Sequence, residues 1–473
     1  MIDQLATLIN WVRQHGGHLH PDVGIYLDPV TGLSFGVKPS RRSTLPAWET
    51  IVSLPTELSL SYLDAVEAAV EAPSPSSPKE TDGDEEGVPR RPVPLSREIV
   101  SRAKPHVVGR LFLAKQYLAG RSSFWWPYIQ SLPQPGDVEL WNLPTFWPAD
   151  DAELLEGTNV EIGLDKIRAD VAAEYSDATH LLGTYGDEMD RAITVDLYRW
   201  AYCIFSSRSF RPSLVLAGGG RLPDGVSMDD FSVLLPLFDI GNHDMTAEVR
   251  RVNCELRVGR DFEPGHQVFN NYSIKTNAEL LLGYGFMLPL TDDLHNDYIH
   301  VRKRTTEPAA SEEYYISRRP MAHRSSVLGH HRSQLDIPGL DRSGTGSGTG
   351  SGEREVVGAF RHVQPDMVWD IFCTLRSTTT SDPPADERHL RECLFSGRLD
   401  PDSQEYAHME HTVAIIQHKV MQELERLDET EVEVAAGDEE ALTANQRLAL
   451  DYRARCRAVL ENTLEAMGDE VGA

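Results

Sequence analysis

The sequence contains little cysteine, and the cysteines that it has are scattered. Its 473 residues include five cysteines, and no two of them form a CxxC pair. An odd, scattered set argues against a disulfide framework and against a zinc cluster, and it favours a reducing compartment. We therefore expect no metal site, and we expect a cytoplasmic location, a nuclear location or both.

Long apolar runs are also missing. No run of about 18 apolar residues is present, so no transmembrane helix and no membrane partner are expected. The N-terminal stretch "MIDQLATLINWVRQHGG" carries the acid Asp3 and lacks a small-residue cleavage site. Its apolar spacing predicts a structural helix that ends at Gly16–Gly17, in preference to a signal peptide.

Basic residues are in deficit. The formal net charge is −28 and the pI is near 5.0. A field of this sign repels nucleic-acid phosphates and suits a basic protein partner, although solubility alone also explains such a charge. The sequence also lacks a GxSxG motif, an HExxH motif and a P-loop, which are typical of several classes of hydrolase.

Two segments have the composition of unpacked chain. Residues 72–94 are rich in proline, serine and acids, and they predict a disordered acidic insertion. Residues 341–354, "DRSGTGSGTGSGER", predict a flexible Gly/Ser linker. Short strand-like runs dominate 18–70 and 231–301, whereas helical patterns dominate 97–205 and the C-terminal part. A strand-rich region interrupted by a helical insert and followed by a helical domain is predicted.

Polar and aromatic clusters occur where predicted elements end: "GLSFGV" (32–37), "SSRSF" (206–210), "LLPLFDIGNHD" (234–244) and "NNYSIKTNAELLLGYGF" (270–286). Thr276 and Glu279 form a T-x-x-E capping box, which predicts a helix starting near Asn277. Tyr272 would then lie on the loop before this helix. Taken singly, each cluster is more often a turn, a solvated helix end or a core tyrosine than part of a functional site.

The order of these motifs, preceded by "SFWWPYIQSLP", resembles SET-domain methyltransferases of the Rubisco large-subunit and ribosomal lysine methyltransferase class. The resemblance covers residues 1–300 apart from the insertion. It implies an α+β fold: a SET β-fold with a knot-like C-terminal segment, a helical insert and an all-α substrate-binding domain. The corresponding boundaries are 1–96 for the N-terminal SET part, 97–205 for the insert, 206–304 for the C-terminal SET part and 305–473 for the helical domain.

The resemblance also implies S-adenosylmethionine as cofactor and assigns roles to ten residues. Tyr272 matches the catalytic tyrosine. The cofactor-binding positions are Ser34, Phe35 and Gly36, through backbone groups, with Arg208, Asn242 and His243. The substrate positions are Phe210 and Tyr284, in the lysine channel, and Asp239, at the rim where cofactor and target meet.

These residue types suit methyl transfer to an amine. The protein must align a nitrogen with the sulfur–methyl bond, a positioning task worth up to about 7–11 kcal/mol. A lysine ammonium must first lose a proton, and a dry aromatic channel beside a sulfonium favours the neutral amine. Tyr272 and Tyr284 would orient that amine, and Arg208 would bind the cofactor carboxylate through a bidentate fork. His243 is expected to position and not to act as a base.

Three departures and two alternatives qualify this interpretation. Leu33 and Ser34 replace an acid or glycine of the usual cofactor turn, and Ser273 stands where relatives often have glycine or aspartate. The alternatives are a protein-histidine methyltransferase, which the aromatics Phe210 and Tyr284 disfavour, and a weakly active SET scaffold that binds proteins. The expected target is lysine in a basic protein, such as a ribosomal one. The sequence leaves the oligomeric state open.

Overall fold

A computed structural model describes this chain at residues 2–28, 32–71, 91–216, 221–302, 313–332, 357–379, 386–432 and 441–468. The predicted acidic insertion lies outside the described residues over 72–90, and so does the predicted linker at 341–354.

The chain divides into two compact units, each built from two stretches of sequence. The first unit comprises Met1–Asn142 and Ile167–Ser273, and the second comprises Leu143–Lys166 and Ile274–Ala473. Residues 143–166 fall in the predicted helical insert, yet they pack with the C-terminal helices.

The described strands of the first unit form three small antiparallel sheets. One has the order β1-β4-β9-β8, from His18–Leu19, Thr50–Ser53, Glu255–Val258 and Val249–Val252. Another has the order β10-β3-β2, from Gln267–Val268, Gly32–Val37 and Val23–Asp28. The third has the order β5-β7-β6, from Leu60–Ser61, Val233–Leu234 and Ser209–Phe210. Short, separate sheets of this kind leave their ends free to carry loops.

The apolar run before the "DIGNHD" cluster is a much shorter strand than its composition predicts. Only Val233–Leu234 pair, as β7. Pro236 has no N–H to donate to a ladder, and Leu237 adopts a left-handed φ of 70°. The chain then forms the 3₁₀ turn Phe238–Ile240 (η6), so the predicted continuous core strand is wrong beyond Leu234.

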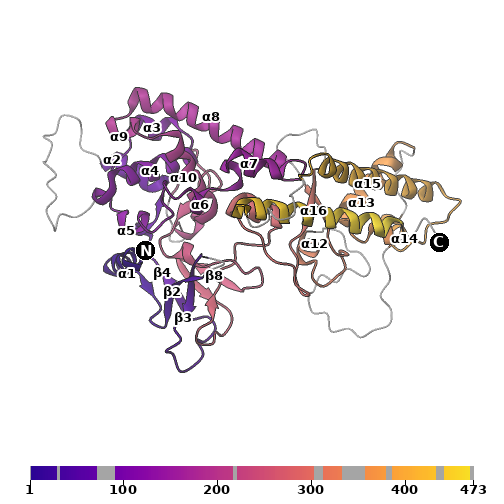
Figure 1. Ribbon diagram of the computed structural model, residues 1–473, viewed down its shortest axis with the longest axis horizontal. Helices are drawn as coiled ribbons and strands as arrows, with labels where there is room; N and C mark the ends of the chain where they lie inside the picture. Colours follow the sequence, from indigo (N-terminus) through magenta and orange to yellow (C-terminus); the bar gives the residue numbers. More distant parts are fainter. Residues whose placement is uncertain are drawn as a thin grey trace. The chain divides into compact units, whose positions relative to one another are not determined.

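Helices make up most of the rest of the first unit. They are α1 (Ile2–Gln14), α2 (Tyr62–Glu71), α3 (Arg97–Arg102), α4 (Pro105–Ala119), α5 (Trp126–Ile129), α6 (Val138–Trp141), most of α8 (Glu161–Tyr185), α9 (Glu188–Arg191) and α10 (Val195–Arg208). In Figure 1, strands β2, β3, β4 and β8 lie together, and α2, α4 and α10 lie together above them. Helix α4 ends at Gly120, as predicted, and this glycine has a φ of 55°. Because α10 ends directly at β6, it delivers the "SSRSF" motif to the sheet β5-β7-β6.

Two distant segments of the first unit run side by side next to β3. Asn270 donates its N–H to the Asn242 carbonyl at 2.7 Å and accepts from the Asp244 N–H at 2.9 Å. Residues 243 and 270 therefore form a parallel bridge. A Cβ on Gly241 would lie 3.1 Å from the Asn270 Cβ and 3.4 Å from the Phe35 ring, so the two segments approach closely at this glycine. The crossing brings the "GNHD" and "NNY" motifs together.

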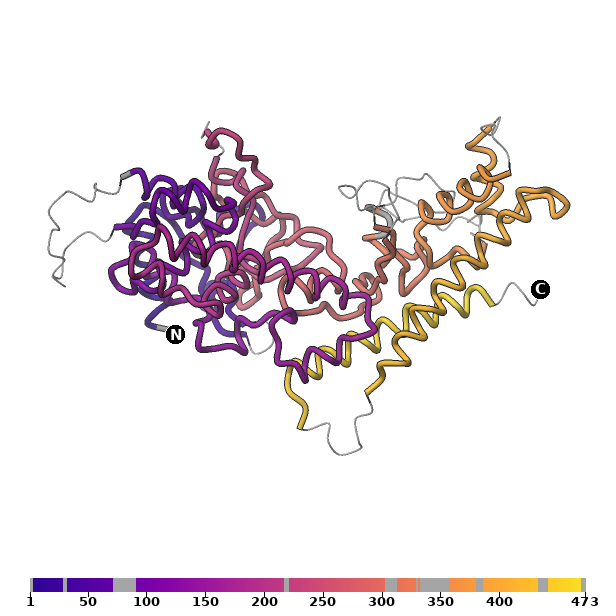
Figure 2. The backbone as a smooth tube through the Cα atoms, turned by 90° about the horizontal axis from the view of Figure 1, so that it is seen from above, coloured from indigo at the N-terminus to yellow at the C-terminus, as the bar shows by residue number. Residues whose placement is uncertain are grey.

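In its described residues, the second unit has a helical core and a pair of antiparallel strands, β11 (Tyr298–Arg302) with β12 (Glu313–Ser317). Its helices are α7 (Ala149–Ala152), α11 (Asn277–Tyr284), α12 (Val327–Arg332), α13 (Pro365–Ser377), α14 (Glu387–Phe395), α15 (Gln404–Glu429) and α16 (Ala444–Gly468). The long helices α15 and α16 lie side by side in both views (Figures 1 and 2). None of the helices in the described ranges is both long and apolar enough to cross a membrane.

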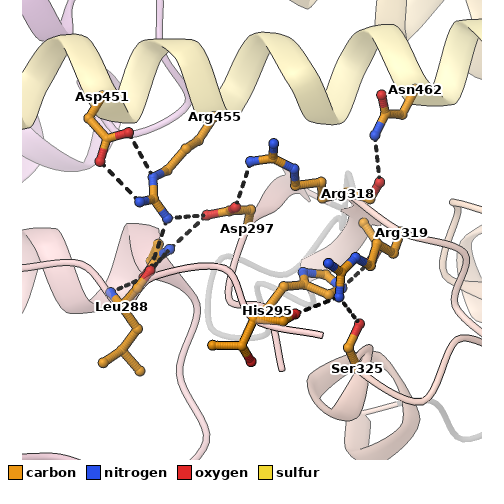
Figure 3. Close-up of polar contacts among 12 residues, drawn as sticks. Leu288, His295, Asp297, Arg318, Arg319, Ser325, Asp451, Arg455 and Asn462 are labelled. Atoms are coloured by element: carbon orange, nitrogen blue, oxygen red, sulfur yellow. Dashed lines mark hydrogen bonds and ion pairs between the residues drawn. The ribbon is translucent and has the colours of Figure 1, made fainter. Parts of the chain in front are cut away.

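A buried carboxylate ties the strand pair of the second unit to α16 (Figure 3). Asp297 is buried, and its Oδ1 accepts from Asn277 Nδ2 at 2.7 Å and lies 3.3 Å from Nη1 of Arg455. Its Oδ2 lies 3.0 Å from Nη1 of Arg318. Arg455 comes from α16 and is also paired with Asp451, which is half exposed. One buried acid therefore joins α11, the strand pair and the C-terminal helix.

Candidate active site

Nine of the ten predicted site residues lie in the first unit, and Tyr284 lies in the second. The nine come from four places: β3, the junction of α10 and β6, the η6 turn with the residues that follow it, and the loop after β10. The contacts below link β3 to the "GNHD" segment, the η6 turn to the end of α10, and the "GNHD" segment to the loop after β10.

Ser34 ties β3 to the "GNHD" segment. Its side chain is fully buried, and its hydroxyl accepts from Asn242 Nδ2 at 2.8 Å and from Gln267 Nε2. Gln267 belongs to β10, which pairs with β3 opposite Gly36. The serine that departs from the usual cofactor turn is therefore a fixed acceptor that sets the orientation of Asn242. Sequence reasoning missed Gln267, which no local motif singles out.

The other two β3 positions are packed on their side-chain faces. Phe35 is fully buried, and its ring lies against Gly241 at the crossing. Gly36 is covered by the Tyr26 ring of β2, and a Cβ at this position would collide with that ring. The side chains of these two residues are therefore not available to a ligand, and their predicted backbone role stays a prediction.

Arg208 and Asp239 form a partly buried ion pair. Arg208 is the last residue of α10, and its Nη1 lies 3.4 Å from both the Oδ2 and the backbone carbonyl of Asp239. The Tyr128 hydroxyl donates to the same Oδ2 at 3.0 Å. Asp239 was predicted at the rim of the site, but its side chain is only 2% exposed. Next to this pair, Phe210 packs edge-on against Phe238, with centroids 6.0 Å apart.

Tyr128 was not among the predicted site residues. It lies in "SFWWPYIQSLP", a stretch that contributes to the family resemblance only through its place in the order of the motifs. Its contact with Asp239 spans 111 residues of sequence, and so no spacing rule could have revealed it.

Tyr272 is fixed by three contacts with the "GNHD" segment. Its ring stacks on His243, with centroids 5.0 Å apart and planes 9° from parallel. Its backbone N–H donates to His243 Nδ1 at 3.1 Å, which makes that nitrogen an acceptor and the ring neutral. Its hydroxyl donates to the Gly241 carbonyl at 3.0 Å, so the phenol oxygen presents lone pairs as an acceptor. Ser273 then turns the chain with a φ of 87°.

Tyr284 ends the helix that follows. The capping box is present as predicted, with Thr276 accepting from the Glu279 N–H and Glu279 accepting from the Thr276 N–H, and α11 begins at Asn277. The Lys275 ammonium lies 5.7 Å from the centroid of the Tyr284 ring. The aromatic face thus already attracts a cation within its own unit.

The described residues contain no group of three or more His, Cys, Asp or Glu side chains that could hold a metal ion. The contacts of the first unit present a guanidinium at Arg208, a neutral imidazole at His243 and a phenol held as an acceptor at Tyr272.

Solved structures identify the fold. The structure of Rubisco LSMT bound to AdoMet aligns with 99% of this chain and 92% of its own, with a TM-score of 0.58 at 15% sequence identity. The chain has the SET-domain fold. The LSMT SET domain bound to lysine and AdoHcy aligns over the same shares, with a TM-score of 0.58 at 16% identity. The predicted α+β SET fold is confirmed.

Sequence relatives of this SET-fold chain are protein methyltransferases. Ribosomal lysine N-methyltransferase set10 of Schizosaccharomyces pombe is 33% identical over 197 residues, which is 39% of this chain and 32% of that protein. N-lysine methyltransferase SETD6 of Homo sapiens is 28% identical over 201 residues, covering 41% and 40%. Actin-histidine N-methyltransferase of Xenopus tropicalis is 25% identical over 201 residues, covering 40% and 32%. The matches thus span about a third to two fifths of these relatives. No protein-family model matches the chain.

Proposed function

We propose that this chain is an S-adenosylmethionine-dependent methyltransferase that acts on the side-chain amine of lysine in a protein. The observation that carries the proposal is the placement of Tyr272, stacked on His243 with its hydroxyl donating to the Gly241 carbonyl. LSMT structures with the same fold contain AdoMet, or lysine and AdoHcy, and two of the relatives are named for lysine.

The residues present fit this cofactor. Arg208 uses only Nη1 for hydrogen bonds within the described part of the chain, which leaves Nε and Nη2 for the carboxylate of a methionine moiety. Its side chain is 26% exposed, so a ligand can reach it. The side chain of Asn242, which donates from Nδ2 to the Ser34 hydroxyl, places its amide group beside the β3 backbone.

When bound, S-adenosylmethionine would supply a methyl group on a sulfonium sulfur, and this methyl group can pass only to an amine that has already lost its proton. The chain contributes orientation. The Tyr272 oxygen, whose own proton is engaged with Gly241, accepts an N–H of the target amine and thereby aims its lone pair. The lysine-channel roles of Phe210 and Tyr284 stay predictions from the family resemblance.

We further propose a basic protein as the partner and the cytoplasm or nucleus as the location. The net charge of −28 favours a basic partner and disfavours nucleic acid. All five cysteines are free thiols, as a reducing compartment would keep them.

The test is transfer of a labelled methyl group from S-adenosylmethionine to fractionated cell extract, followed by mass spectrometry of the labelled protein. Tyr272→Phe should keep the thermal shift produced by S-adenosylmethionine and lose at least about 100-fold in transfer rate. Tyr175→Phe is the matched control, because its hydroxyl also donates to a backbone carbonyl at 3.0 Å, that of Ile193.

The outcomes are distinct. Label on lysine supports the proposal. Label on histidine would favour the function of the actin-histidine relatives. Binding of the cofactor without any transfer would favour a protein-binding scaffold, and a fully active Tyr272→Phe would remove this tyrosine from its role.

A further inference from the structure

Tyr128 is a buried tyrosine that the proposed reaction does not use. It lies in α5, in the helical part of the first unit, and is 1% exposed. A buried hydroxyl requires a partner, and its partner is the Oδ2 of Asp239, at 3.0 Å. A residue of the helical part is thereby joined to the turn that precedes the "GNHD" motif.

The position of the Asp239 carboxylate is set by a small number of polar contacts. Its Oδ2 accepts from Tyr128 and lies 3.4 Å from Arg208 Nη1, while its Oδ1 is buried and has no hydrogen-bond partner within the described ranges. Removing one of the remaining donors from a buried carboxylate that already has one unsatisfied oxygen destabilises the charged group strongly. Loss of the Tyr128 hydroxyl would therefore move or reorient this carboxylate.

Among the described residues, the hydrogen bonds of the Arg208 side chain all go to Asp239. Both of its hydrogen bonds within the described part of the chain, to Oδ2 and to the backbone carbonyl of Asp239, leave from Nη1. At 3.4 Å each, they are long, so the guanidinium is oriented but not firmly fixed. The direction of its free edge, Nε and Nη2, follows the position of Asp239.

We infer that Tyr128 is a positioning residue for cofactor recognition: through Asp239, it orients Arg208 toward the carboxylate of S-adenosylmethionine. The inference rests on the proposed function and extends it to the helical insert. Tyr128 touches neither cofactor nor target in this scheme, and its effect is confined to the part of the cofactor that Arg208 recognises.

The directions in which the pKa values of Tyr128 and Asp239 are shifted agree with this geometry. Burial, followed by the negative charge of Asp239, raises the pKa of the Tyr128 phenol well above its ordinary value. Burial also raises the pKa of Asp239, against the opposing effect of Arg208. The phenol therefore stays protonated and remains the donor of this hydrogen bond.

The experiment measures binding of S-adenosylmethionine and of its decarboxylated form by calorimetry. In Tyr128→Phe, we expect S-adenosylmethionine to bind about five- to tenfold more weakly, the effect of one lost hydrogen bond, and the decarboxylated form to bind as in the wild type within about twofold. Asp239→Asn, which keeps the shape and removes the charge, should show the same selectivity.

Tyr198→Phe is the matched control. Tyr198 is also fully buried, donates to a carboxylate at 3.0 Å, and that carboxylate, Glu174, also pairs with an arginine, Arg110. Tyr198 precedes Arg208 by ten residues on α10, or about 15 Å along the helix. This variant should leave the affinity of both ligands unchanged.

A double variant separates positioning from general loosening. In an Arg208→Gln background, Tyr128→Phe should add less than about twofold to the loss of S-adenosylmethionine affinity. The inference is overturned if Tyr128→Phe weakens both ligands equally, if it weakens neither, or if its full effect persists without Arg208. Absence of S-adenosylmethionine binding by the wild type would instead overturn the proposed function, and this inference with it.

Discussion

Replacing Asp297 by alanine should destabilise the second unit strongly. The carboxylate is 2% exposed and accepts from Asn277 while it neutralises Arg318 and Arg455, whose side chains are 26% and 17% exposed. Removing the shared acid leaves two poorly solvated guanidinium groups without their common partner. Breaking a buried pair in this way costs about 3–5 kcal/mol. For a unit of this size, that corresponds to a fall in Tm of about 6–20 °C.

The assay is urea and thermal unfolding followed by far-UV circular dichroism. Asp451→Ala is the matched control, because Asp451 also pairs with Arg455, at 3.0 Å, but is 51% exposed. An exposed pair contributes at most about 1 kcal/mol, so the control should change stability little. If the decreases in the free energy of unfolding caused by Asp297→Ala and by Asp451→Ala differ by less than about 1 kcal/mol, the buried acid has no special role in stability.

Three further predictions concern the first unit. Asn242→Ala should raise the Kd for S-adenosylmethionine by about tenfold, since the amide oriented by Ser34 is lost; an unchanged Kd in calorimetry would contradict its placement. Ser273→Gly should keep activity and leave stability equal or up to about 1 kcal/mol higher in urea titrations, because a φ of 87° strains serine; a loss of 1 kcal/mol or more would show that no strain is present. Burial raises the pKa of Asp64 to about 7, partly opposed by a hydrogen bond from Ser61. Because the folded pKa lies above the unfolded one, the stability contributed by protonated Asp64 is complete below about pH 4 and is lost as the pH rises through 7. Asp64→Asn should flatten this part of the stability profile by more than about 1 kcal/mol, and an identical slope in the variant would count against it.

Local signals in the sequence predicted local structure well. The capping box at Thr276 and Glu279 fixes the start of α11 because both hydrogen bonds form within one helical turn. The end of α4 at Gly120 could be predicted for the same reason, since a helix C-cap is also a local feature. The prediction for the apolar run at 231–238 was wrong, because composition alone suggested a continuous strand. Strand β7 has only two residues, and Pro236 and the left-handed Leu237 follow it.

The contacts that build the site join residues far apart in the sequence, and local signals therefore do not predict them. Ser34 and Asn242 are 208 residues apart, and Tyr128 and Asp239 are 111 apart. The order of the motifs identified both residues of the first pair and Asp239 of the second. It did not reveal the hydrogen bond within either pair. Nothing in the spacing distinguishes an Asp239 at an exposed rim from one buried beside Arg208, because burial depends on what packs from the helical part of the chain.

The discontinuity of the two units has a consequence for synthesis of the protein. The stretch 143–166 emerges early but belongs to a core whose other members begin at Ile274. Tyr272 comes at the very end of the first unit, on the segment that must lie alongside His243. A nascent chain therefore cannot assemble the tyrosine–histidine stack until the first unit is almost fully synthesised. Until the helices of the second unit are translated, the apolar side chains of Leu154 and Leu155 have no core to pack against. Chaperone binding during translation is consequently expected to concentrate on this early stretch.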